Sequence, residues 1–173
     1  MAVVTRHLPR GFTLIELLVV LVVIGVALST LQLNLFSDDA GRLRQEGERL
    51  AALLTALADE AVTGGRPLAV AFDDGGYVFF EPVARPDADT ARWRPRPGDE
   101  MFAPRTWPPG IRVVEAYSGA RPVTRAQPLV FAPSGLNAPF RVVLALADAR
   151  VRVLGDAAGN LRVEDGADFM DAR

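Results

Sequence analysis

The sequence predicts an α+β protein, in which one long N-terminal helix is followed by an antiparallel β head. Three observations predict this fold class. An apolar run over residues 12–28 merges into an amphipathic stretch that ends near Thr63. From Pro67 onward, short segments alternate between apolar and polar residues, as half-buried strands do. Clusters of glycine, proline, asparagine and aspartate separate those segments and mark turns.

The first element is the apolar segment. Residues 1–11 contain Arg6 and Arg10 but no acid, and the apolar run that follows is interrupted by Glu16. An ordinary secretory signal peptide would end in a small-residue cleavage site, and none stands at the far end of this run. The run reaches about 25 Å as a helix, and its continuation completes a bilayer core of about 30 Å. We therefore expect a transmembrane helix over residues 12–36, with the two arginines on the cytoplasmic side.

The second element continues the same helix over residues 37–63. Apolar residues recur there at helical spacing, and charged residues are expected to occupy the other faces: Arg42, Arg44, Glu46, Glu48, Arg49, Asp59 and Glu60. Gly64 and Gly65 supply a C-terminal stop, and Pro67 prevents continuation of the helix.

The head is then expected to be a β-sheet region over residues 67–165. A hairpin joins strands at 68–72 and 77–81 through a turn of two aspartates and two glycines. Residues 82–110 are rich in proline and arginine and are expected to be mainly loop. Further strands are expected at 111–117, 129–133, 140–147, 150–155 and 161–165. The six or seven strands should form one sheet on the helix, with room for a second.

Composition excludes several kinds of chemistry. The chain has no cysteine and a single histidine, His7, so a histidine-based triad or a multi-histidine zinc site cannot form in the head. Ser134 lacks the nucleophile-elbow pattern, and no phosphate-binding glycine loop occurs. Acid pairs could in principle bind Ca²⁺, but Asp73-Asp74 is typical of a turn, and a solvated tail is expected for the C-terminal acids Glu164, Asp165, Asp168 and Asp171. We expect no enzyme activity, no cofactor and no metal site.

The segment GFTLIELLVVLVVIGVALS, from Gly11 to Ser29, resembles the prepilin-type cleavage and methylation motif of type IV pilins and type II secretion pseudopilins. The resemblance implies that residues 1–11 are a leader, cut between Gly11 and Phe12 by a prepilin peptidase. It also implies N-methylation of Phe12 and a role for Glu16 in assembly of the filament. Residues 37–173 would then be a periplasmic head on a single-pass inner-membrane anchor.

A second, looser resemblance covers about a third of the head. The segment FAPSGLNAPFRVVLAL, the short hairpin after it and the hairpin ending in YVFF resemble the GspH/FimT group of pseudopilins. The resemblance implies a pilin-like head with two β-sheets and a minor component of the type II secretion pseudopilus, which takes part in export of folded proteins across the outer membrane. It further implies contacts with the major pseudopilin (type G), the minor pseudopilins of types I, J and K, the inner-membrane assembly platform and membrane lipid.

An alternative comes from FimT-like minor pilins of type IV pili, some of which bind DNA for uptake. Arginines around Trp93 and Trp107 would suit contacts with single strands: Arg85, Arg92, Arg94, Arg96 and Arg105. The same residues can instead stack on each other in a loop, where neighbouring acids cancel their field. Because the mature chain would carry a net charge of about −4 by the same resemblance, we do not expect nucleic acid as a partner.

Overall fold

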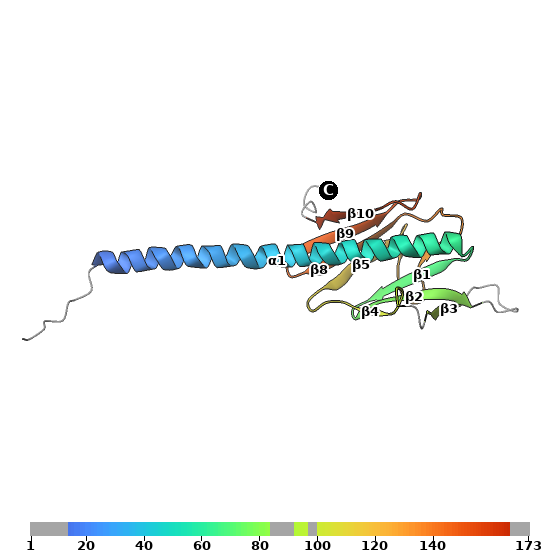
Figure 1. The fold of residues 1–173 in the computed structure, drawn as a ribbon, viewed down its shortest axis with the longest axis horizontal. Coiled ribbons are helices and arrows are strands. Elements are labelled where there is room, and N and C mark those ends of the chain that lie inside the picture. Colours follow the sequence, from blue (N-terminus) through green and yellow to red (C-terminus); the bar gives the residue numbers. More distant parts are fainter. Residues whose placement is uncertain (1–13, 84–91, 97–99, 167–173) are drawn as a thin grey trace, which may run out of the picture. The chain divides into compact units, whose positions relative to one another are not determined.

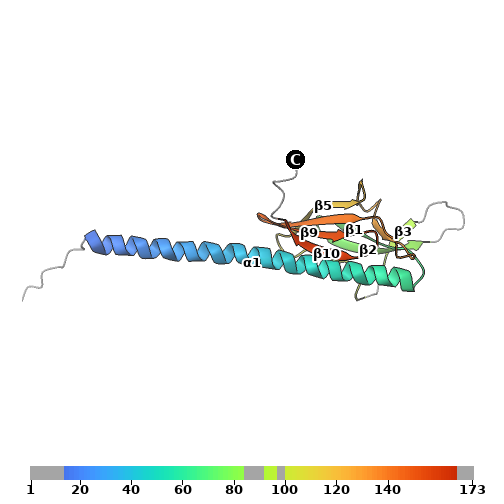
Figure 2. The same cartoon turned by 90° about the horizontal axis from the view of Figure 1, so that it is seen from above.

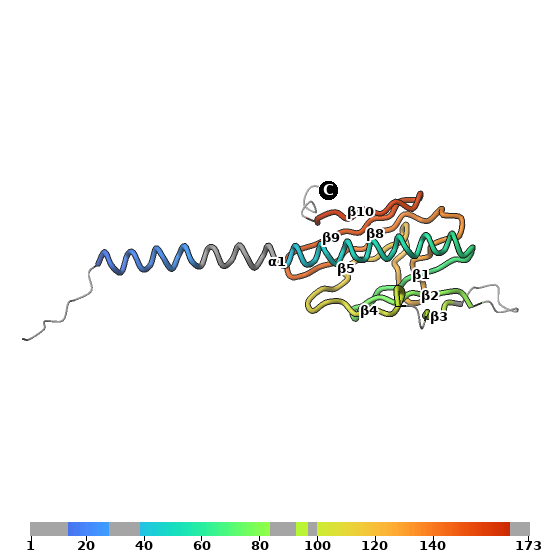
Figure 3. The backbone as a smooth tube through the Cα atoms, viewed as in Figure 1, coloured from blue at the N-terminus to red at the C-terminus, as the bar shows by residue number. Residues whose placement is uncertain are grey.

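The computed structural model describes residues 14–83, 92–96 and 100–166, excluding the side chains of residues 28–38 and Arg92. Figure 3 shows the course of this backbone. The chain divides into two compact units, Met1–Asp38 and Asp39–Arg173.

One helix, α1, runs from Leu14 to Thr63, which confirms the long N-terminal helix expected from the sequence. In the first unit its described side chains, from residue 14 to residue 27, are all exposed. In the second unit, five apolar residues with helical spacing are completely buried: Leu43, Leu50, Leu54, Leu57 and Ala61. This stripe attaches residues 39–63 to the head, since an amphipathic helix is stabilised chiefly by packing of its apolar face.

The helix ends as the glycine pair predicts. Gly65 adopts a left-handed conformation with φ of 58°, which a residue without a Cβ adopts readily. The amide of Gly65 donates to the carbonyl of Val62 and the amide of Arg66 to that of Ala61, both at 3.2 Å. This pair of bonds is the Schellman motif, and it satisfies carbonyls that the last helical turn leaves without partners.

Within the described residues, ten strands follow and form two antiparallel sheets. Figures 1 and 2 show these strands beside the C-terminal part of the helix. The first sheet has the order β3-β2-β1-β7, with β4 also paired to β2. Its strands are β1 (Leu68–Asp73), β2 (Gly76–Val83), β3 (Arg92–Pro95), β4 (Arg105–Thr106) and β7 (Leu129–Phe131). The predicted hairpin is confirmed, and Asp73 Oδ1 accepts hydrogen bonds from the amides of Gly75 and Gly76, both at 2.9 Å.

The second sheet has the order β10-β9-β8-β5-β6. Its strands are β5 (Arg112–Ser118), β6 (Arg121–Pro122), β8 (Phe140–Leu146), β9 (Ala149–Gly155) and β10 (Leu161–Asp165). Strands β8, β9 and β10 form the meander expected from the sequence, and β5 pairs with β8 through a bulge between Val113 and Glu115.

The main core lies between the head portion of α1 and both sheets. One cluster of buried side chains contains the leucine stripe of the helix together with residues of each sheet, such as Phe79, Phe131, Val142 and Val153. The helix approaches the second sheet closely at Gly47, where an added Cβ would lie 2.7 Å from Cγ1 of Val151. A smaller cluster, Ala69, Ala71 and Phe80 with Val78 and Trp93 packed against it, covers the other face of the first sheet.

The structure adds to or differs from the sequence expectations at three places. The region 82–110 contains two short strands, β3 and β4, and β6 forms where no strand was expected. Each consists of only two to four residues and is held by pairing to a longer strand, and a segment this short shows no periodicity from which to predict it. Glu164 and Asp165 belong to β10 and form ion pairs with Arg152, Arg162 and Arg44, so they are not a free tail. Asp168 and Asp171 lie outside the described residues.

Candidate functional site

The N-terminal part of α1 exposes a continuous apolar surface. Leu14 is 86% exposed and Ile15 72%, and the other large apolar side chains through Val26 are also exposed. An exposed apolar surface of this extent is typical of a segment that contacts another protein chain or lipid. Among the helices that the structure describes, none is long and apolar enough to qualify as a membrane span.

Glu16 is the acid in the first turn of this helix, and its side chain is exposed. An acid in that position interacts favourably with the helix dipole by about 0.3–1 kcal/mol, which is a weak effect. The other two residues of the predicted processing site, Gly11 and Phe12, lie outside the described residues.

Among the described residues of this arginine- and tryptophan-rich region, Trp107 is buried and Arg94 and Arg96 are paired with acids. Trp107 is 5% exposed, packs against Tyr77, and donates from Nε1 to the carbonyl of Asp73 at 2.9 Å. It is therefore a core residue, unsuited to stacking on a base. Trp93 is half-buried on β3.

Arg94 and Arg96 form ion pairs with glutamates in a network at the C-terminal end of α1. Oε1 of Glu60 lies 2.8 Å from Nη2 of Arg96 and 3.6 Å from Nη2 of Arg66. Nη1 of Arg66 in turn lies 2.8 Å from Oε2 of Glu81. Oε1 of Glu81 also accepts a hydrogen bond from Nε of Arg94 at 2.7 Å. The hydrogen bonds from Arg94 and Arg66 hold the pKa of the Glu81 carboxyl below its ordinary value. The network joins the helix to β2 and β3 and pairs Arg94 and Arg96 with acids, which weakens the positive field that a DNA contact would use. Arg85 and the side chain of Arg92 lie outside the described residues.

Glu46 is buried, contrary to the expectation that it occupies an outer face of the helix. It is 6% exposed, and its nearest cation is Nη1 of Arg49, 3.7 Å from Oε2. Its position three residues after Leu43 and four before Leu50 places it within the buried stripe, and that spacing is the signal the sequence analysis missed. Burial raises the pKa of the Glu46 carboxyl. Burial, and then the charge of Glu46, raise the pKa of Tyr77 to about 12.

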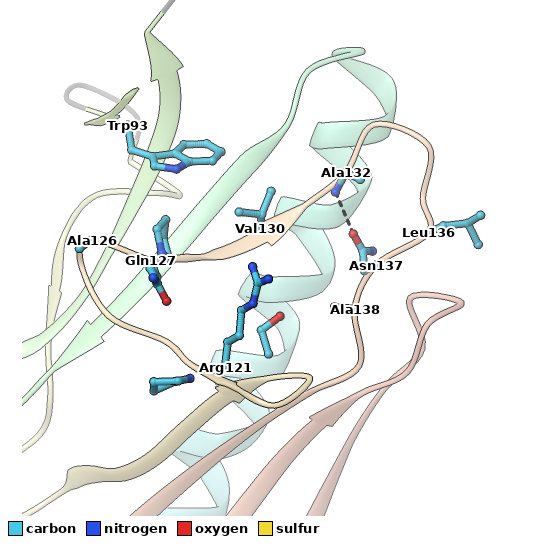
Figure 4. A pocket seen from close by; sticks show the side chains of 12 residues that line it. Trp93, Arg121, Ala126, Gln127, Val130, Ala132, Leu136, Asn137 and Ala138 are labelled. Carbon is cyan, nitrogen blue, oxygen red and sulfur yellow. Dashed lines mark hydrogen bonds between the residues drawn. The ribbon is translucent and has the colours of Figure 1, made fainter. Parts of the chain in front are cut away.

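The head carries a groove of about 460 Å³ along strand β7. Figure 4 shows Val130 of β7 lying between Trp93 of β3 and Arg121 of β6, with Asn137 at one end. The lining residues are Trp93, Ser118, Arg121, Pro122, Ala126, Gln127, Pro128, Val130, Ala132, Leu136, Asn137 and Ala138. Arg121 is the only charged residue among them, so the groove is an apolar and neutral surface with a single cation.

Comparison with known proteins shows which family the chain resembles. The model of the family described as Type II transport protein GspH matches residues 46–159, from the buried Glu46 to the turn before β10. The chain belongs to the GspH family. A second family model, the prokaryotic N-terminal methylation motif, matches residues 6–31, a stretch that includes Gly11, Phe12 and Glu16.

Curated relatives carry the name type II secretion system protein H. The protein from Pseudomonas aeruginosa is 40% identical over 96 residues, which are 55% of this chain and 54% of that protein. The protein from Aeromonas hydrophila is 25% identical over 177 aligned residues, covering 91% of this chain and 94% of its own. The Escherichia coli protein is 31% identical over 88 residues, 50% of this chain and 51% of that protein. The chain thus aligns with about half the length of two of these three GspH relatives.

Solved structures agree with the GspH fold. The minor pseudopilin EpsH from the Vibrio cholerae type 2 secretion system has a TM-score of 0.56 at 21% identity, covering 73% of this chain and 98% of that one. The solution structure of Escherichia coli GspH has a TM-score of 0.59 at 19% identity, covering 77% and 96%. At these identities the likeness shows a shared fold, and it confirms the expectation of a helix followed by two antiparallel sheets.

Proposed function

We propose that the chain is a minor pseudopilin of a type II secretion system, a component of the periplasmic pseudopilus that takes part in export of folded proteins across the outer membrane. The observation that carries the proposal is the GspH family match over residues 46–159, which covers most of the head. The secretion-system names of the curated relatives favour this role over the type IV pilus alternative. The ion pairs of Arg94 and Arg96 and the burial of Trp107 also weigh against DNA binding.

The proposal includes maturation at the N-terminus. Residues 1–11 act as a leader that a prepilin peptidase removes between Gly11 and Phe12, and Phe12 is then N-methylated. Residues 12–36 anchor the mature chain in the inner membrane, with residues 37–173 in the periplasm. The methylation-motif match over residues 6–31 and the exposed apolar side chains of residues 14–26 support this part. A glycine before the scissile bond lets a protease approach the backbone closely.

Glu16 serves assembly in this proposal. Once neighbouring helices cover the apolar segment, a carboxylate there needs a cationic partner, because a buried unpaired charge is costly. The methylated amine of Phe12 on an adjacent pseudopilin stands at the same end of the same element. A charge-assisted hydrogen bond between the two would fix the axial register of the filament. The proposed partners are the major pseudopilin (type G), the minor pseudopilins of types I, J and K, and the assembly platform.

Processing is tested by intact-mass analysis of chains purified from cells with and without prepilin peptidase. We expect a mature chain that begins at methylated Phe12 only when the peptidase is present. Gly11→Val should block this cleavage, because its side chain crowds the scissile bond, whereas Gly25→Val in the same apolar segment should be processed normally. A mature chain that begins elsewhere in either strain would refute the maturation proposal.

Assembly is tested with Glu16→Val in a strain that lacks the chromosomal copy of the gene. We expect normal insertion and leader removal, but reduced co-purification with the other pseudopilins and reduced secretion of an exported enzyme. Leu17→Val is the matched control, since it also changes an exposed side chain of the first helical turns without removing a charge. Full secretion with Glu16→Val would show that the carboxylate has no assembly role in this protein. Secretion that does not require the chain at all would refute the proposed function.

A further inference from the structure

Strand β7 is the terminal strand of the first sheet, and its outer edge has no strand partner among the described residues. The edge that faces β1 is paired from Leu129 to Phe131. An unpaired strand edge presents N–H and C=O groups that a further strand can bind. Proteins commonly cover such an edge or interrupt it with proline, and here Pro128 and Pro133 lie on either side of the short strand.

The direction of the unpaired groups follows from a neighbouring side chain. The amide of Ala132 donates to Oδ1 of Asn137 at 2.8 Å, the contact drawn in Figure 4. Backbone amides two residues apart point to the same edge of a strand, so the N–H and C=O of Val130 face the edge at which Asn137 lies. Asn137 is itself held in place, because its own amide donates to the carbonyl of Ala157 at 3.2 Å. The Asn137 side chain therefore accepts the hydrogen bond of the Ala132 amide. The amide of Val130, on the same edge, would need an acceptor from an added strand.

The groove lies along this same edge. Its volume of about 460 Å³ falls within the range of about 300–1,000 Å³ that is common for binding pockets. The facing strand β6 cannot complete the pairing as a ladder, because Pro122 lacks an amide hydrogen. Val130 is 37% exposed and Leu136 71%, so apolar side chains are available on the floor and at one end.

Arg121 adds a charge preference. It extends from β6 toward β7 in Figure 4, and no acid among the described residues lies within ion-pair distance of it. Two other exposed arginines of the head are paired with acids, Arg125 with Asp73 at 2.6 Å and Arg141 with Glu115 at 3.0 Å. A planar guanidinium beside a strand edge suits recognition of a carboxylate.

We propose that the groove binds an extended segment of another protein of the secretion machinery, which adds to β7 as a strand and places an acidic side chain against Arg121. Strand addition gives affinity through main-chain hydrogen bonds, while pockets for alternate side chains give selectivity. The proposal rests on the proposed function for its partner, but the strand edge, the groove and the cation are properties of this chain alone.

The absence of cysteine from the chain allows a direct test, since any introduced thiol is unique. Val130→Cys places a thiol in the groove, and Val114→Cys places one on β5, where the valine is 40% exposed and outside the groove. Each full-length variant is labelled with a maleimide in cells that contain all other pseudopilins and in cells that lack them. We expect the complete machinery to slow labelling at residue 130 about tenfold, equivalent to about 1.4 kcal/mol of binding, and to change labelling at residue 114 little.

Arg121→Glu in the Val130→Cys background should restore rapid labelling, because the acid of the partner would then face a like charge. Arg112→Glu, an exposed arginine of β5 outside the groove, is the matched control and should leave the protection intact. A benzophenone attached to the thiol at residue 130 should crosslink, on illumination, to a peptide that contains Asp or Glu and is extended in its own protein.

Three results would overturn the proposal: equal slowing at both thiols, protection that survives Arg121→Glu, or a crosslink to lipid or to a helix. Secretion is measured in the same strains. A chain that is required for secretion but whose thiol at residue 130 stays fully reactive would contradict the strand addition and leave the proposed function intact.

Discussion

The close approach of α1 to the second sheet at Gly47 can be tested by one added methyl group. A Cβ at residue 47 would lie 2.7 Å from Cγ1 of Val151 and 3.4 Å from Cγ1 of Val163. Val151 is 2% exposed and β-branched, so it has little freedom to rotate away within β9. The helix or the strand must therefore shift to admit the methyl group.

The size of the effect follows from two opposing contributions. Overpacking a core typically costs about 1–3 kcal/mol, while replacing glycine by alanine inside a helix gains up to about 1 kcal/mol. Gly47→Ala should therefore lower the free energy of unfolding by about 1 kcal/mol. Gly41→Ala is the matched control, because its Cβ would meet nothing within 4 Å and only the helical gain of up to about 1 kcal/mol applies. The same substitution should have opposite signs six residues apart in one helix.

The assay is urea and thermal unfolding of the head beginning at residue 37. At about 2–4 °C per kcal/mol for a domain of about this size, the two variants should melt about 5 °C apart. In a Val151→Ala background the penalty of Gly47→Ala should shrink, since the clashing methyl group is gone. Equal stabilisation by both substitutions would refute the packing of α1 against β9 at this site.

Three further predictions follow from the head. Glu46→Gln should raise the free energy of unfolding of the head at neutral pH and change it less near pH 4. Because burial raises the pKa of Glu46, the stability that its carboxyl contributes is fully present below the unfolded pKa of 4.5 and is lost as pH rises through the folded pKa. Unfolding curves from pH 4 to pH 7.5 can measure this difference. Trp107→Phe should lower the unfolding free energy by about 1–3 kcal/mol, because it removes the hydrogen bond to the Asp73 carbonyl and leaves that space partly unfilled; unfolding no different from wild type would contradict the buried bond. The head from residue 37 should be a cooperatively folding monomer in sedimentation and calorimetry, since its core lies within residues 43–153, and a broad non-cooperative transition would refute that boundary.

Local features of the fold can be predicted from the sequence because they depend on neighbours in the chain. The end of α1 follows from Gly64, Gly65 and Pro67, and the first hairpin from Asp73 and the two glycines after it. The meander of β8, β9 and β10 follows from alternation, because each strand pairs with the next in sequence. The N-terminal motif is likewise contiguous, so its resemblance could be recognised from about twenty residues.

Tertiary structure alone decides what distant segments do to one another. The pairing of β7 with β1 joins residues about sixty positions apart, and this pairing leaves the outer edge of β7 beside the groove. Arg94 and Arg96 suggest a basic surface in sequence, but Glu81 and Glu60 reach them only through the folded sheet and the end of the helix. Glu46 looks like one more charge on an amphipathic helix, and only the sheets packed against α1 make it a buried carboxylate. Sequence patterns determined which elements form, because propensity and periodicity are local, whereas burial and ion pairing needed the tertiary structure because they depend on which elements meet.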